Sequence, residues 1–135
     1  MKVKAFIEKG NDGTYGVYID LEENRLTYGI IGDGDTVEEA IADFYNSYEE
    51  MKLHYTEQEK VFQEVEFEFE YDVASFLSYY AEKLSKSGLE HITGINQKQL
   101  GHYSSGHKRP KTETVKKIQL ALNNFGKELS QLQLY

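Results

Sequence analysis

The chain has 135 residues, of which 39% are hydrophobic and 13% aromatic, enough for a packed core in one ordinary domain or two small ones. The absence of cysteine excludes a disulfide framework, a thiolate zinc site and a cysteine nucleophile. No stretch approaches the length of an apolar membrane span, and the N-terminus lacks the apolar segment of a signal peptide. We therefore expect a soluble, cytoplasmic protein with no membrane partner.

Charge is distributed unevenly along the chain, whose formal net charge is -8. Residues 1–71 carry 6 Lys+Arg against 18 Asp+Glu, a net charge of -12, whereas residues 72–135 carry 9 against 5, a net charge of +4. This segregation predicts two domains, 1–71 and 72–135, that bind different partners. No Gly- or Pro-rich linker separates them, so we expect the two domains to be closely coupled.

Alternation with a period of two predicts strands in the first part of the chain. Residues 2–8 and 15–20 each place apolar side chains on one face, and the Gly-Asn-Asp-Gly sequence at 10–13 suits a hairpin turn. Residues 26–31, after a polar turn at 22–25, predict a weaker third strand. The expected result is a three-stranded antiparallel meander.

A long helix is predicted next. Thr36 and Glu39 have the spacing of a capping box, in which each side chain bonds the free backbone N–H of the other residue. The apolar side chains that follow recur at steps of three and four: Val37, Ala40, Ile41, Phe44, Tyr48, Met51 and Tyr55. Such a stripe has the length to cover one face of a small sheet.

A fourth strand is predicted at 64–71, where acidic and apolar residues alternate strictly. Its acidic face consists of Glu64, Glu66, Glu68 and Glu70. A carboxylate row of this kind is typical of a solvated face or of a guarded sheet edge. The alternative is a docking surface for a basic protein, and these four glutamates are then the candidates for contacting it.

The second domain is expected to be helical. A helical run covers residues 72–85, and a two-turn helix at 87–93 follows it. Gly94 suits the left-handed position that ends this helix, and Asn96 suits the N-cap of the next one. The spacing predicts two short helices joined by a sharp turn.

The outward face of the second short helix carries side chains that can bind base edges, while Leu100 and Tyr103 are expected to face inward. Glutamine offers a donor and an acceptor to adenine, and lysine reaches guanine O6 and N7. The base-edge candidates are Gln97, Lys98, Gln99 and His102. The loop that follows adds three cations and free backbone amides for phosphates. Its candidates are Ser105, Gly106, His107, Lys108, Arg109 and Lys111. The alternative is a small helical domain whose polar residues simply contact water.

Residues 87–111 resemble the phage-repressor (lambda-type, or XRE) helix-turn-helix family. The resemblance rests on the Gly94-Ile95 turn, the Asn96 cap, the late aromatic Tyr103 and the Gly-x-Lys-x-Pro loop at 106–110. It implies base contacts at Gln97, Lys98 and His102. It implies phosphate contacts at Asn96, Ser104, His107, Lys108 and Arg109.

The whole chain is similar to HicB antitoxins of bacterial toxin–antitoxin pairs, through the order of its predicted elements and its helix start at residues 35–40, Asp-Thr-Val-Glu-Glu-Ala. The resemblance implies an α+β chain: an N-terminal βββαβ domain, a partial ribonuclease H-like fold, followed by an all-α helix-turn-helix domain. It implies an antitoxin that neutralises a HicA-type mRNA-cleaving toxin and represses its own operon by binding double-stranded operator DNA. The alternative is a free-standing helix-turn-helix repressor whose first domain oligomerises or senses a ligand.

Signatures of enzymes fail on inspection. The glycines at 101 and 106 have P-loop spacing but lack the Lys-Ser/Thr that follows in that motif, and the four histidines lack zinc-ligand spacing. We expect no catalytic site, no metal and no cofactor. Residues 112–132 predict a last helix whose apolar side chains recur at steps of three and four, as core alone or as core plus the seam of a homodimer.

Overall fold

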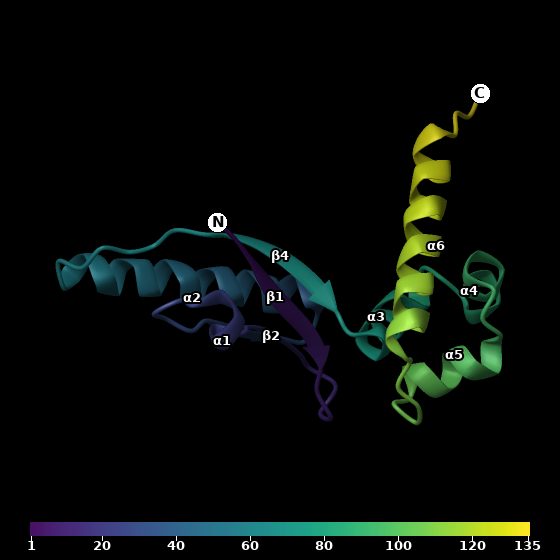
Figure 1. The fold of residues 1–135 in the computed structure, drawn as a ribbon, viewed down its shortest axis with the longest axis horizontal. Helices are drawn as coiled ribbons and strands as arrows, with labels where there is room; N and C mark the ends of the chain where they lie inside the picture. Colours follow the sequence, from purple (N-terminus) through teal and green to yellow (C-terminus); the bar gives the residue numbers. More distant parts are fainter. The chain divides into compact units, whose positions relative to one another are not determined.

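A computed structural model describes residues 1–135, except for the side chain of Asn24 (Figure 1). The described residues form a mixed α/β structure with a four-stranded mixed sheet and six α-helices. The chain divides into two compact units, Met1–Asp72 and Val73–Tyr135. Among the helices of the described residues, none combines the length and the apolar character that crossing a membrane requires.

The sheet of the first unit contains β1 (Lys2–Lys9), β2 (Tyr15–Ile19), β3 (Ile31–Gly34) and β4 (Glu66–Tyr71), in the spatial order β3-β2-β1-β4. β1 and β3 both pair antiparallel with β2, whereas β4 pairs parallel with β1. A parallel pair requires a long crossover connection, and α2 (Val37–Glu57) lies within it.

The third strand lies later in the chain than the alternation predicts. Residues 26–30 form no strand, although Leu26, Tyr28 and Ile30 are buried, so the prediction of a strand at 26–31 is wrong except for its last residue. The polar turn predicted at 22–25 is largely helical, since α1 spans Leu21–Asn24. The alternation of apolar residues therefore predicted correctly that these side chains are buried, but it did not predict the backbone conformation.

Glycine decides where β3 lies. A Cβ atom on Gly32 would stand 2.4 Å from the backbone nitrogen of Phe44, and one on Gly34 would stand 2.5 Å from that of Ala40. Only residues without a side chain allow β3 to approach the backbone of α2 so closely. Both glycines therefore belong to β3, beyond the end of the strand predicted at 26–31.

α2 lies along one face of the sheet and buries its apolar stripe there (Figure 1). Phe44 is fully buried, and its ring centroid lies 4.8 Å from that of Phe67 in β4. At the start of α2 the backbone N–H of Glu39 donates to Thr36 Oγ1 over 3.1 Å, as the capping box predicts. The Glu39 carboxylate accepts from the backbone N–H of Asp35 over 3.0 Å instead of that of Thr36.

The second unit contains α3 (Val73–Tyr79), a 3-10 turn (Tyr80–Glu82), α4 (Lys86–Thr93), α5 (Gln97–Ser104) and α6 (Thr112–Gln131). The helical run predicted for residues 72–85 thus ends at Tyr79. Ser85 caps α4 instead, accepting from the backbone N–H of Gly88 over 3.0 Å. The buried core of this unit consists of Leu77, Leu89, Leu100 and Tyr103.

The C-terminal half of α6 extends beyond α3, α4 and α5 (Figure 1). Ile118 is buried and Leu122 packs against the core, but Leu129 is 50% exposed and Leu132 is 61% exposed. The apolar repeat of α6 therefore supplies core in its first half and exposed apolar surface in its second.

Candidate functional site

A sharp turn joins α4 to α5. Gly94 adopts the left-handed conformation, with φ 75°, and its N–H donates to the carbonyl of Glu90 over 2.8 Å. Most residues with a side chain are strained in this conformation, so glycine is favoured here. Asn96 caps α5, its side-chain oxygen accepting from the backbone N–H of Gln99 over 2.8 Å. The cap engages this oxygen and leaves the Asn96 side-chain nitrogen available to donate to another acceptor.

The first turn of α5 exposes two of the four base-edge candidates. Gln97 and Lys98 are exposed, and Gln97 Nε2 donates to the carboxylate of Glu90 over 3.3 Å. Gln99 is half-buried, and its Nε2 donates to the hydroxyl of Tyr103 over 2.9 Å. Gln97 and Lys98 are therefore the two candidates whose side chains are exposed in the first turn of α5.

The loop after α5 folds back onto the end of that helix. The backbone N–H of Lys108 donates to the carbonyl of His102 over 3.2 Å, and Ser105 Oγ donates to the same carbonyl over 3.2 Å. Gly106 has φ 78°, which favours glycine. Residues 105–109 are all exposed. These bonds hold the backbone of the loop, up to Lys108, against the C-terminal end of α5.

His102 and His107 lie together, with ring centroids 5.0 Å apart. Nδ1 of His102 is buried and has no hydrogen-bond partner among the described residues. Desolvation lowers the pKa of His102, and the charge of Lys108, followed by His107 and Lys98, lowers it further. The pairing was not predicted. The sequence signal that could have indicated this pairing is the spacing of five residues between the two histidines, which lie on either side of the end of α5.

Two other residues differ from the sequence-based expectation. Ser104, a phosphate candidate, is half-buried and lines a pocket of about 240 Å³ together with Leu77 and Leu100. Lys86, which no motif predicts, is exposed, and its Nζ would lie 3.6 Å from a Cβ on Gly101 of α5. The structure thus places Ser104 against the core and adds the cation of Lys86 beside α5.

Residues 94–111 are basic as a segment, although the carboxylate of Glu90 lies next to Gln97. They contain four cations and no carboxylate, and Lys111 is exposed where the loop meets α6. No protein-family model, curated protein or solved structure that was searched matches this chain. Its function is therefore inferred from this surface, from the acidic face of the first unit and from the resemblances in the sequence.

The four glutamates predicted to form one row do not all lie on one face. Glu66, Glu68 and Glu70 alternate along β4 on the face opposite α2. Glu68 pairs with Lys2 of β1 over 3.0 Å, and Glu70 pairs with Lys4 over 3.3 Å. Exposed pairs like these stabilise little, but they neutralise charge locally.

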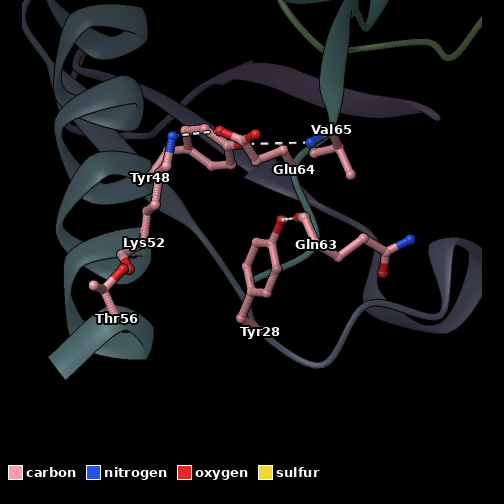
Figure 2. Close-up of polar contacts among 7 residues, drawn as sticks. All are labelled: Tyr28, Tyr48, Lys52, Thr56, Gln63, Glu64 and Val65. Atoms are coloured by element: carbon pink, nitrogen blue, oxygen red, sulfur yellow. Dashed lines mark hydrogen bonds and ion pairs between the residues drawn. The ribbon is translucent and has the colours of Figure 1, made fainter. Parts of the chain in front are cut away.

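Glu64 precedes β4 and forms an ion pair with Lys52 of α2 (Figure 2). The next residue, Val65, donates its backbone N–H to the hydroxyl of Tyr48 over 3.1 Å. These bonds tie the segment before β4 to α2. Glu64 is thereby separated from the other three glutamates, which lie on the open face.

Tyr28 also binds the segment before β4, because its hydroxyl donates to the backbone carbonyl of Gln63 over 2.6 Å (Figure 2). Its ring stacks on Phe62 with a centroid distance of 4.7 Å. Burial raises the pKa of Tyr28 to about 12, so the hydroxyl stays protonated and donates throughout the physiological range. Among the described side chains, no three His, Asp or Glu lie together in a way that would hold a metal ion.

Proposed function

We propose that this chain is an antitoxin that also represses its own operon. Its basic domain binds operator DNA, and its acidic domain binds and masks a small basic toxin of the HicA type. The surface of residues 94–111 carries the DNA-binding part: a capped helix exposes Gln97 and Lys98 beside a loop that contains Lys108 and Arg109, with no carboxylate in the stretch. Nucleic acid is the partner that this charge and these side chains fit best.

The N-terminal end of α5 enters the major groove. There Gln97 forms paired hydrogen bonds with adenine, and Lys98 donates to guanine. Lys108, Arg109 and Lys111 contact phosphates and set the position of the helix. His102 lies at the margin of the groove, where protonation adds a further phosphate contact.

The toxin-binding part rests on charge and on the resemblance to HicB antitoxins. The net charge of -12 on residues 1–71 attracts a basic toxin and repels the RNA that would compete for it. The finer fold belongs to the same proposal: a βββαβ domain of partial ribonuclease H type, with α1 as an addition, precedes a lambda-repressor-like domain. The protein acts in the cytoplasm and binds a two-fold operator as a homodimer.

DNA binding is tested with the full-length chain and a labelled duplex taken from upstream of its own gene. Fluorescence anisotropy should show binding at least about 10³-fold tighter than to a scrambled duplex of the same composition, and affinity should fall steeply with salt. Equal affinity for both duplexes, or none, would contradict a sequence-specific repressor.

Toxin binding is tested by co-expression with a small basic protein encoded beside this gene. The antitoxin proposal expects the two chains to co-purify and the growth arrest caused by the basic chain to be relieved. Sequence-specific DNA binding without co-purification would favour a free-standing repressor whose first domain oligomerises or senses a ligand.

A further inference from the structure

The face of the sheet that α2 does not cover carries an apolar row. Phe6 of β1 pairs in register with Tyr18 of β2, and Tyr18 pairs with Ile31 of β3. The rings of Phe6 and Tyr18 lie 5.6 Å apart. Tyr18 is 38% exposed and Ile31 is 66% exposed. Three strands therefore present a contiguous apolar surface to solvent in an otherwise acidic domain.

The next row on the same face has a different character. Glu8 pairs in register with Gly16, and Gly16 pairs with Asp33, so a glycine separates two carboxylates. A Cβ on Gly16 would meet no atom closer than 3.8 Å, where Asp33 Oδ1 lies. The gap belongs to a surface hollow of about 510 Å³ whose lining includes Glu8, Asp12, Gly16, Tyr18 and Asp33. Lys9 is the one cationic residue of this lining, against the three carboxylates of Glu8, Asp12 and Asp33.

This geometry fits the side chain of an arginine or lysine. Its methylene groups would lie on the Tyr18 ring, and its cationic head would enter the gap over Gly16 between Glu8 and Asp33. The hydroxyl of Tyr18 donates to Glu8 Oε1 over 2.8 Å, which holds one of these carboxylates in place. Aromatic contact combined with a carboxylate pair is a common way for proteins to bind a cationic side chain.

We propose that this open face, centred on Phe6, Tyr18 and Ile31, is the surface that binds the basic partner protein, and that the gap over Gly16 receives one of its cationic side chains. The inference rests on the proposed antitoxin function and specifies where the partner binds. It moves the centre of the interface from β4, where Lys2 and Lys4 neutralise Glu68 and Glu70, to β1, β2 and β3.

Charge selects this occupant over the alternatives. The first domain of a second copy would bring a net charge of -12 against the same carboxylates, and its basic domain is the part proposed to bind DNA. Nucleic acid would be repelled by this face. A basic protein with an apolar centre to its surface complements both rows at once.

The test uses the full-length chain and the co-expressed basic protein encoded beside its gene. Ile31→Lys places a cation in the apolar row, and Leu53→Lys, at a 59% exposed position on α2, is the matched control because it adds the same charge to the same domain. Titration by isothermal calorimetry should show binding weakened about 30-fold or more by Ile31→Lys and changed less than about twofold by Leu53→Lys.

A second variant keeps the charge unchanged. Gly16→Val fills the gap between Glu8 and Asp33 with a residue that strands favour, in a position with room for it. It should weaken binding about tenfold while the thermal unfolding temperature is maintained. This result is expected even if Ile31→Lys fails to fold.

The outcomes separate the two proposals. Normal binding by both Ile31→Lys and Gly16→Val would overturn the open face as the binding surface and leave the antitoxin function intact. Equal loss in Leu53→Lys would also overturn it, because the effect would then follow from charge alone. If the unmodified chain does not bind the basic protein, the antitoxin function is wrong, and so is the assignment of a basic protein to this face.

Discussion

The two units of this protein place their cations in opposite settings. In the first unit, three lysines form ion pairs with carboxylates: Lys2 with Glu68, Lys4 with Glu70 and Lys52 with Glu64. In the second unit, none of the ion pairs found among the described residues involves Lys98, Lys108 or Arg109. The overall charge of -8 therefore conceals an unpaired basic surface. The charge of each domain, more than that of the chain, indicates the partner.

The units also differ in their cores. In the first, a sheet and a helix bury large side chains completely, among them Ile7, Val17 and Phe44. In the second, short helices enclose a small cluster around Leu100. We therefore expect the second unit to be the less stable of the two, since less apolar area is buried.

The largest expected effect breaks the second unit alone. Leu100 is 1% exposed, so Leu100→Ala should destabilise that unit by about 2–5 kcal/mol. Denaturation by urea, followed by circular dichroism, should show the helical unit unfolding before the sheet unit. Leu120→Ala, at a 62% exposed position on α6, should change stability by less than about 0.5 kcal/mol. A single unchanged transition in Leu100→Ala would contradict two separate cores.

The next effect concerns sequence recognition by the second unit. Because Gln97 is exposed in the first turn of α5, Gln97→Ala should remove about 1–3 kcal/mol of discrimination at one operator base pair. Selection of bound duplexes from a randomised pool measures this directly. An unchanged base preference would remove Gln97 from the recognition surface, and Gln99→Ala, at the half-buried neighbour, serves as the comparison.

A smaller effect concerns phosphate binding. Lys108→Ala should weaken binding to all duplexes by a similar factor. It should also lower the magnitude of the slope of log affinity against log salt concentration by about one unit. Anisotropy titrations at several salt concentrations measure that slope. Lys60→Ala, an exposed lysine of the acidic domain, should leave it unchanged. A loss confined to the operator duplex would mean that Lys108 contacts a base.

The smallest effect is a dependence on pH. The pKa of His102 is lowered in the free protein by desolvation first and then by Lys108, His107 and Lys98, so the ring is neutral at pH 7. Nearby phosphates would raise this pKa, so binding would take up a proton, and DNA affinity should increase as the pH falls from 7.5 to 6. One proton allows at most about tenfold per pH unit. His102→Gln should reduce this dependence of affinity on pH. If the variant and the unmodified chain show the same pH profile, His102 is not the group that takes up the proton.

The same shift affects stability with the opposite sign. Because the pKa of His102 is lower in the folded than in the unfolded chain, the unfolded chain binds more protons between the two values. The stability contributed by the neutral ring is present above about pH 6.5 and is lost as the pH falls through the folded-state pKa. Binding should therefore strengthen in the range in which the free second unit weakens.

Local signals in the sequence predict much of this structure. Thr36 and Asn96 cap the helices that their spacing predicts, and Gly94 ends α4 in the left-handed conformation. These features depend on neighbours three or four residues away, so periodicity and capping rules detect them.

The features that the sequence does not predict depend on contacts between residues far apart in the chain. β3 lies at Gly32 and Gly34 because α2 approaches them, and no local pattern reports that approach. Glu64 forms an ion pair with Lys52 of α2, a partner 12 residues away that the alternation of the strand does not predict. In the candidate DNA surface, exposure of Gln97 agrees with the expectation, but the position of Ser104 against the core does not.

The central claim is that the basic surface of the second unit binds DNA although the chain as a whole is acidic. Lys98→Glu and Lys60→Glu make the same change in net charge, one on α5 and one in the acidic domain. A carboxylate in the first turn of a helix is favourable for folding, so Lys98→Glu should remain folded. Anisotropy with the upstream duplex should show affinity reduced about 30-fold or more by Lys98→Glu and less than about twofold by Lys60→Glu. Equal reductions, or no binding by the unmodified chain, would contradict the claim.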